Sequence, residues 1–501
     1  MKYLLSIIIL LFLLVGTIYG LLFTAPGNQF LQPIIEQKIA DQIALSTKLE
    51  HFLLRPDRFE VSLKIGDDTS IQTKGTIELG TQSIDATYDV AIHELSQLQT
   101  LIGQQLNGPF QTHGNIKGDL KIMTIDGVSD VAKSQTAYHL TLREFTPEAL
   151  TAKIAHLHID QLLYMLNQPI YTKGLVDIDA NIPQLDMESL KGNIVTTLSQ
   201  GMLQPTPIQK DFNISIPHNL TFNGDIQTRL IGTKAISHLD LTTSIANFQS
   251  KSLVYNLKEG SLSTDYDLQV PDLDKLYFIT QQHMDGEVNL TGDVKVDQEN
   301  IQINTHANIF GGVLEATYKK KLSKLYVKIQ NIQTVALTDM LLYPHIFDSR
   351  ANVTIDYNTD KEDGTLHAEL LNGQILPNKM SFLLQQMANF DITKEIYQRT
   401  IIDTKIDKKV LHSDLYMKSR LTEINSTNGT IDLEDQTIDT TLNIKIRKNK
   451  LPVTLTGALT SPDIKIDTKA LFKSKAKEEL KKRLPENIKE SPFGDLIKNF
   501  L

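Results

Sequence analysis

Two histidines and an aspartate occupy alternate positions in one short stretch of the chain, at His156, His158 and Asp160. Alternate side chains of an extended strand point to the same face, and imidazole nitrogens with a carboxylate oxygen are ligands that Zn²⁺ accepts. Alternating polar residues are also typical of the hydrated face of a strand. Both interpretations are open from the spacing; the hydrated face is the simpler one, so we expect no metal and no other cofactor.

The sequence motifs of common enzyme classes are incomplete or absent. His93-Glu94 begins like the helix motif of zinc proteases, but Gln97 stands where the second histidine is required. The sequence contains neither a Gly-rich loop ending in Gly-Lys-Ser/Thr nor a Gly-x-Ser-x-Gly motif. With no cysteine in the chain, thiolate nucleophiles, thiolate metal sites and disulfides are excluded. The sequence therefore predicts a protein that is not an enzyme.

Three Asn-x-Ser/Thr triplets carry an acidic residue two positions before the asparagine, where abundance alone suggests about one of the six in the chain. They resemble the sequon of bacterial N-glycosylation systems, which makes Asn213, Asn289 and Asn425 possible modification sites. The net charge of −9, with no basic stripe alternating with aromatic residues, argues against nucleic acid as a partner.

The clearest structural pattern follows Gly286. Val288, Leu290, Val294 and Val296 occupy every second position around Gly292, and polar residues fill the positions between them. This alternation predicts a half-buried β-strand. A second alternating segment precedes it at 265–270, and Pro271-Asp272 then ends that strand and begins a short apolar helix. The unit reads strand, one or two helical turns, strand.

Similar units recur along the chain. The alternating segments start at residues 114, 174, 224, 286 and 349, which are separated by 60, 50, 62 and 63 residues. Short helices are expected at 96–105, 159–166, 273–282, 338–344 and 379–397. Residues 46–467 are therefore predicted to form a quasi-repeating β structure with short cross-over helices.

A sheet with one continuous apolar face must bury that face against something. The helices that separate the strand groups do not suit a two-sheet sandwich, so we expect a long, curved antiparallel sheet whose groove is lined by Val, Ile and Leu and suits acyl chains. The candidate groove residues are Ile116, Leu120, Ile122, Val176, Ile178, Ile182, Val288, Leu290, Val294, Val296, Val353 and Ile355.

The two ends of the chain differ from the middle. Residues 3–23 carry no charge and are long enough to cross a hydrocarbon core of about 30 Å, which predicts a transmembrane anchor over residues 1–24. A cleaved signal peptide is the alternative. Lys2 precedes the run, so the N-terminus is expected in the cytoplasm and the rest of the chain outside it.

Apolar residues at helical spacing, from Leu31 to Ile43, predict an amphipathic connecting helix within residues 25–45 that can cap the first strands. Residues 468–501 are predicted to form a basic amphipathic helix, at 470–484, and a tail. This helix could contact anionic headgroups or a partner, or it could cover the edge of the last strand.

With this organisation the chain resembles the AsmA-like superfamily of envelope proteins, which includes AsmA, TamB and YdbH. The resemblance rests on the anchor, the helix after it, the phrases VPDLDKL and MDGEVNLTGDV within residues 270–294, and the ending PVTLTGALTSPDIKID at 452–467. The last phrase is the most specific, because it combines a strand pair with Gly457 and Ser461-Pro462 before a terminal helix.

The resemblance implies an inner-membrane protein whose taco-shaped β-groove lies in the periplasm and moves phospholipid between the inner and outer membranes. It implies no catalytic residues and no cofactor. The C-terminal end would contact the outer membrane or an outer-membrane protein. The alternative that the same resemblance offers is a TamB-like scaffold that assists outer-membrane protein assembly or envelope integrity.

Overall fold

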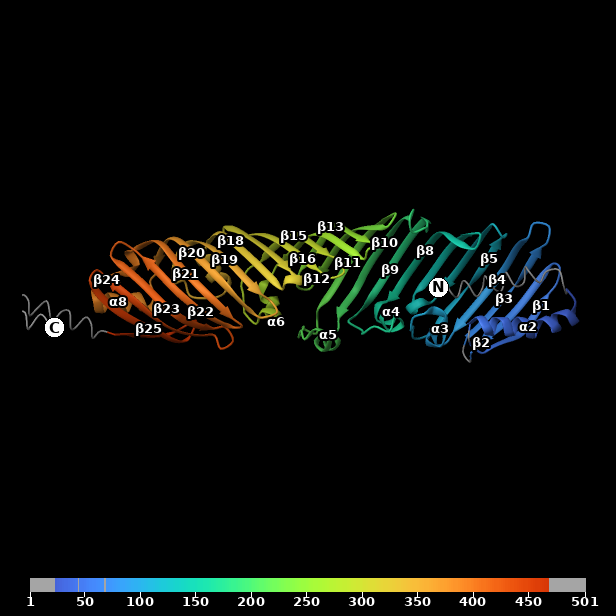
Figure 1. Ribbon diagram of the computed structural model, residues 1–501, viewed down its shortest axis with the longest axis horizontal. Coiled ribbons are helices and arrows are strands. Elements are labelled where there is room, and N and C mark those ends of the chain that lie inside the picture. Colours follow the sequence, from blue (N-terminus) through green and yellow to red (C-terminus); the bar gives the residue numbers. More distant parts are fainter. Residues whose placement is uncertain (1–22, 44, 67–68, 468–501) are drawn as a thin grey trace, which may run out of the picture. The chain divides into compact units, whose positions relative to one another are not determined.

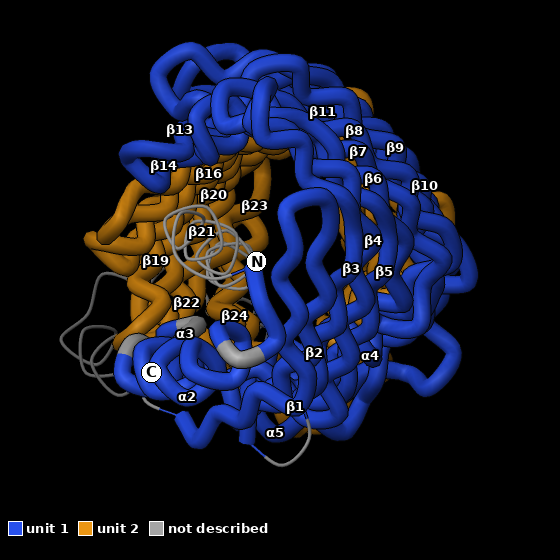
Figure 2. Tube along the Cα trace, turned by 90° about the vertical axis from the view of Figure 1, so that its right-hand side faces the viewer, with its two compact units in different colours: residues 1–265 blue, residues 266–501 orange. Residues whose placement is uncertain are grey.

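The computed structural model describes residues 23–43, 45–66 and 69–467. The chain divides into two compact units, residues 1–265 and 266–501 (Figures 1 and 2). The predicted anchor, apart from Phe23 and Thr24, and the predicted basic helix and tail at 468–501 lie outside the described residues. Among the helices that are described, none is both long enough and apolar enough to cross a membrane.

Unit 1 is built almost entirely of strands. Its elements are α2 (Ala25–Ile43), β1 (Thr47–Leu54), β2 (Arg58–Ile65), β3 (Thr69–Glu78), β4 (Ser83–Ile92), η1 (Leu95–Leu98), α3 (Gln99–Ile102), β5 (Phe110–Gly118), β6 (Ile122–Ser129), η2 (Val131–Lys133), β7 (Gln135–Arg143), β8 (Thr146–His158), α4 (Ile159–Met165), β9 (Thr172–Gln184), β10 (Lys191–Leu203), α5 (Pro205–Phe212), β11 (Thr221–Ile231), β12 (Lys234–Thr243) and β13 (Asn247–Asn256). β14 (Ser261–Val270) contains the boundary between the units.

Unit 2 is also built almost entirely of strands. Its elements are η3 (Leu273–Leu276), α6 (Tyr277–Thr280), β15 (Val288–Val296), β16 (Ile301–Ile309), β17 (Gly312–Lys319), η4 (Lys320–Leu322), β18 (Lys324–Gln333), α7 (Thr334–Met340), β19 (Phe347–Asn358), β20 (Asp363–Ile375), α8 (Lys379–Ala388), η5 (Ile392–Lys394), β21 (Ile396–Asp407), β22 (Val410–Lys418), β23 (Thr422–Asp432), β24 (Thr437–Ile446), β25 (Asn449–Ala458) and β26 (Asp463–Ile466).

Each strand pairs antiparallel with the next strand in the sequence, from β1 to β13 in unit 1 and from β15 to β26 in unit 2. Figure 1 shows the consecutive strands of each unit side by side. Among the described strands, no pairing closes either series on itself, so the prediction of an open, all-β, antiparallel sheet with few short helices is confirmed.

The predicted segment starts fall where the chain returns to the sheet after a helix. The starts at 114, 174, 224, 286 and 349 lie within or next to β5, β9, β11, β15 and β19, each of which is the first strand after a helix. Four strands follow three of these helices, as in β5–β8 and β15–β18, whereas β9–β10 is a pair of 13-residue strands. The pair explains the one short interval of 50 residues.

The helix predicted at 338–344 lies earlier in the chain, as α7 at Thr334–Met340. Two further differences concern α5 and α8. Helix α5 was not predicted. Its Pro205 and Pro207 both lie in the first turn, where a missing N–H costs nothing. The helix predicted at 379–397 ends at Ala388, and Asn389 follows it in the left-handed conformation. β21 already begins at Ile396.

The first series of strands is capped by α2, as the apolar spacing predicted. Leu31, Ile35, Ile39 and Ile43 are buried on the side of the helix that joins the core of β1–β7, whereas Ile34 is exposed. A second large core lies at the other end of the chain, where Leu384 of α8 is buried with residues of β21–β25. The strands nearest to each chain end are therefore the best packed of their unit.

Candidate functional site: the apolar sheet face

In unit 2 the cross-strand register collects the apolar residues of successive strands into rows. The three rows are Val294, Ile303, Tyr318, Leu325 and Tyr357; Gly292, Thr305, Ala316, Val327, Ile355 and Leu366; and Ala307, Leu314, Ile329, Val353 and Ala368. Their members are two positions apart along each strand, so all three rows lie on one face. We call this the apolar face of unit 2.

Unit 1 carries the equivalent surface on β9–β13. Its rows are Val176, Leu198, Gly224, Leu241 and Phe248; Ile178, Thr196, Ile226, Leu239 and Ser250; and Ala180, Ile194, Thr228, Ser237 and Leu253. We call this the apolar face of unit 1. The six rows contain apolar, glycine, hydroxyl and tyrosine residues and no ionisable group other than tyrosine.

Several hydroxyl groups on or beside these faces are hydrogen-bonded to protein atoms. Thr228 and Ser237 share a hydrogen bond of 2.8 Å across β11 and β12. In unit 2 the Tyr266 hydroxyl donates to the Asn304 carbonyl at 3.2 Å and lies 2.7 Å from Thr305 Oγ1. A hydroxyl with its partner supplied needs no water, so these groups do not oppose contact with hydrocarbon.

Exposure differs along the faces. Of the side chains in β15, none is fully buried, and Val288, Leu290, Val294 and Val296 are all half-buried. In β2 the corresponding alternate positions are closed, with Phe59 and Leu63 each only 1% exposed. The β2 residues belong to the core that also contains the buried side of α2, whereas none of the four β15 residues belongs to a hydrophobic core of the described chain, so they can accept an apolar ligand.

The candidate groove residues fall into four groups, of which the last, Leu120 and Ile122, lies off the apolar side. Ile178, Val353 and Ile355 are half-buried on the apolar faces together with the four residues of β15, and Val176 and Ile182 lie on the same side of β9 but are more buried. Ile116 points to the apolar side of β5, where it is fully enclosed in the core of unit 1. Burial of this kind depends on α2 and the neighbouring strands and cannot be read from alternation.

The structure corrects the predicted positions of Leu120 and Ile122. β5 ends at Gly118, and Asp119 makes a turn in which its Oδ1 accepts from the N–H groups of Lys121 and Ile122 at 2.8 Å each. Leu120 therefore lies in a turn, and Ile122 begins β6 on the side opposite to the buried Met123. Both are exposed. Asp119 could have indicated this turn from the sequence, because aspartate at such a position favours a turn.

The residues that suggested metal or protease chemistry have structural partners. His156 Nδ1 lies 3.2 Å from Asp177 Oδ1 across β8 and β9, and Glu94 caps η1 by accepting from the N–H groups of Ser96 and Gly108. Within the described parts of the chain, no three His, Cys, Asp or Glu residues are grouped so that they could hold a metal ion.

The three candidate glycosylation sites differ in their surroundings. Asn213 is exposed at the C-terminal end of α5, where it adopts the left-handed conformation, and Asn289 is exposed on β15. Asn425 is half-buried on β23 and accepts a hydrogen bond of 3.3 Å from Asn443. Access for a glycosyltransferase is therefore best at the first two.

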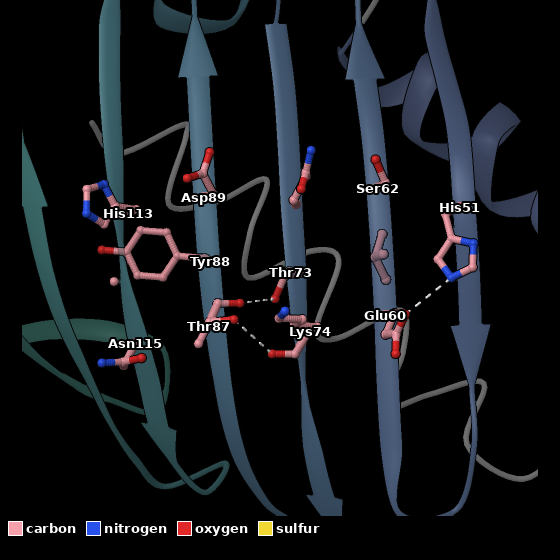
Figure 3. A pocket seen from close by; sticks show the side chains of 13 residues that line it. His51, Glu60, Ser62, Thr73, Lys74, Thr87, Tyr88, Asp89, His113 and Asn115 are labelled. Atoms are coloured by element: carbon pink, nitrogen blue, oxygen red, sulfur yellow. Dashed lines mark hydrogen bonds and ion pairs between the residues drawn. The ribbon is translucent and has the colours of Figure 1, made fainter.

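A polar depression of about 540 Å³ lies on β1–β5 (Figure 3). Its charged lining comes from alternate positions of neighbouring strands and mixes His51, Glu60, Lys74, Asp89 and His113. His51 Nε2 lies 3.5 Å from Glu60 Oε2. Such cross-strand pairs are typical of a hydrated sheet surface, so we assign this depression no chemistry.

Comparison with known proteins adds no relative. No family model matches the sequence, and neither the curated proteins nor the solved structures contain a match to it.

Proposed function

We propose that the apolar faces bind the acyl chains of phospholipids and that the protein moves phospholipid between the two membranes of a bacterial envelope. The observation that carries the proposal is the charge-free face, with many half-buried side chains, that runs from row to row over β9–β13 in unit 1 and, separately, over β15–β19 in unit 2. A soluble protein seldom exposes a contiguous apolar surface of this extent without a ligand or partner for it.

The dimensions support an acyl chain as the ligand. Strands are about 4.8 Å apart, so five strands span about 19 Å along a row. A bilayer core of about 30 Å holds two acyl chains end to end, which gives about 15 Å for each chain. One chain can therefore lie along a row within either unit, gaining about 0.8 kcal/mol for each methylene removed from water.

Features of the sequence also support the proposed membrane location and transport. The uncharged run at 3–23 would anchor the chain in the inner membrane with its bulk in the periplasm, and the resemblance to AsmA-like proteins implies the same arrangement. An open face with no enclosing second sheet also allows a lipid to leave as easily as it binds, as a transfer protein requires.

The test compares lipid content between two matched variants of the full chain. Leu290→Asp places a charge on the apolar face, whereas Asn289→Asp places the same charge on the opposite side of β15. After purification from cells, phospholipid per chain is measured by extraction and mass spectrometry. We expect Leu290→Asp to carry less phospholipid than wild type and Asn289→Asp to match wild type, with the circular dichroism of all three alike. Equal phospholipid in all three folded proteins would reject acyl binding on this face and favour the scaffold function.

A further inference from the structure

Unit 1 contains one register row that continues from the first strands to the last. It runs through Phe52, Val61, Thr73, Tyr88, Gly114, Gly127, Tyr138, Ala152, Ala180, Ile194, Thr228, Ser237 and Leu253. The residues from Phe52 to Tyr88 are all buried. Further on, Tyr138, Ala152, Ile194, Thr228 and Leu253 are half-exposed, and only the small residues Ala180 and Ser237 among them are buried. The same face is therefore closed at the β1 end and accessible further on.

Helix α2 is the element that closes this end. Its buried side, with Ile35 and Ile39, belongs to the same core as Val61 and Leu63 of β2. Figure 2 shows α2 beside β1 and β2, at the end of the series of strands. An acyl chain cannot occupy a site that these side chains already fill at the density of a protein interior.

Helix α2 also occupies the hydrogen-bonding edge of β1. The Glu36 carboxylate accepts from the Leu49 N–H at 2.9 Å, and the Gln32 side-chain amide donates to the Leu49 carbonyl at 2.6 Å. The Asn28 amide donates to the Leu54 carbonyl at 3.3 Å. These bonds satisfy main-chain groups that an edge strand otherwise offers to another strand, and they hold the helix in place over the end of the sheet.

A pair of tyrosines marks the transition. Tyr88 and Tyr138 lie at the two ends of a four-strand row with Gly114 and Gly127 between them, and their hydroxyl oxygens are 2.7 Å apart. Tyr138 also lies 2.7 Å from Thr112 Oγ1, which donates to the Val128 carbonyl at 2.9 Å. This hydroxyl chain ties β4 to β7 across the glycines. Burial raises the pKa of Tyr88 above its ordinary value, so the Tyr88 hydroxyl stays neutral.

From these observations we infer that α2 seals the β1 end of unit 1, so that acyl chains occupy this unit only beyond the Tyr88–Tyr138 pair, on β8–β13, and cannot pass the β1 edge. The inference rests on the proposed function. Helix α2 directly follows the predicted anchor in the sequence. Lipid would therefore have to reach the apolar face of unit 1 from the side of the sheet, and not from the anchor past the β1 edge.

The absence of cysteine in the chain allows a direct test with single-cysteine variants of the full-length protein. Ile226→Cys probes the accessible part of the face and Val61→Cys the sealed part. The neighbouring outward-facing variants, Gln227→Cys and Glu60→Cys, are the matched controls. Labelling rates with a small neutral maleimide are measured before and after incubation with vesicles of phosphatidylethanolamine and phosphatidylglycerol.

We expect Ile226→Cys to react at least about tenfold faster than Val61→Cys, because a buried thiol reacts only after local opening, and to be slowed by the vesicles. Val61→Cys should be insensitive to them. Combining Val61→Cys with Glu36→Ala, which removes the acceptor for the Leu49 N–H, should raise its rate. If Val61→Cys disturbs folding by circular dichroism, Ala86→Cys replaces it, since Ala86 is also buried on this face.

Two results would overturn the inference, and they differ in what else they reject. Fast, vesicle-protected labelling of both Ile226→Cys and the β2 or β4 cysteine would show that lipid reaches the β1 end, and the proposed function would stand. Labelling of Ile226→Cys that vesicles do not slow would reject acyl binding in unit 1, and with it both proposals for this unit.

Discussion

β2 and β15 carry nearly the same sequence pattern and differ in what covers them. Phe59, Val61, Leu63 and Ile65 alternate along β2 as Val288, Leu290, Val294 and Val296 alternate along β15. The β2 residues are at most 3% exposed in the core that they share with α2, whereas those of β15 are all half-buried. Alternation therefore shows that a face is apolar, and the presence of a covering helix decides whether that face is core or binding surface.

The largest expected difference between the two strands is the cost of a buried charge. Leu63→Asp removes a packed side chain and leaves an unpaired carboxylate in the core, which should cost more than about 3 kcal/mol of unfolding free energy. Leu290→Asp loses only half a leucine's burial and keeps its carboxylate hydrated, so about 1 kcal/mol is expected.

Denaturant unfolding of both variants, with hydrogen exchange to locate the affected strands, measures this difference. Similar losses for the two substitutions would mean that β15 is covered as completely as β2, and the comparison on which the proposed function depends would fail.

A smaller loss of stability is expected from a substitution beside the Tyr88–Tyr138 pair, which fills the apolar face of unit 1 at this point. A Cβ added at Gly127 would meet the Tyr88 hydroxyl at 2.1 Å and the Tyr138 ring at 2.6 Å. Gly127→Ala should therefore displace both rings and destabilise unit 1 by about 1–3 kcal/mol. Gly80→Ala is the control, because a Cβ there meets nothing within 4 Å.

Thermal unfolding of the two glycine variants gives the comparison. Equal melting temperatures would show that the rings of Tyr88 and Tyr138 move aside freely, and that the packed end of unit 1 is looser than its burial indicates.

The smallest expected effect on stability comes from the turn between β5 and β6, which lies on neither apolar face. Hydrogen bonds from the Ile122 and Lys121 N–H groups lower the pKa of Asp119. As its pKa is lower in the folded than in the unfolded state, its ionised form stabilises the fold above about pH 4, and this contribution disappears as the pH falls through the folded-state pKa.

Asp119→Asn keeps a side-chain oxygen for the turn but has no charge to lose. Its melting temperature should be slightly below that of wild type at pH 7 and equal to it at strongly acidic pH, with phospholipid content unchanged. A melting-temperature difference that is constant with pH would show that the charge of Asp119 contributes nothing to the turn.

The sequence alone determined the strand character, the apolar side of each strand and the return of the chain to the sheet after short helices. These properties are local, because a side-chain period of two and a proline or aspartate at a turn act over a few residues. The same locality explains the errors. Continuing the alternation through Asp119 placed Leu120 and Ile122 on the wrong surface, and α5 was not predicted.

The tertiary structure alone decided which part of the apolar surface is free. Ile116 and Ile178 have the same pattern around them, yet Ile116 is closed in the core and Ile178 remains half-exposed. The difference depends on contacts between residues far apart in the chain, such as those that bring α2 onto β1 and join Tyr88 to Tyr138, which are 50 positions apart. Alternation fixes the direction of a side chain, but only the packing of distant segments determines whether anything lies in that direction.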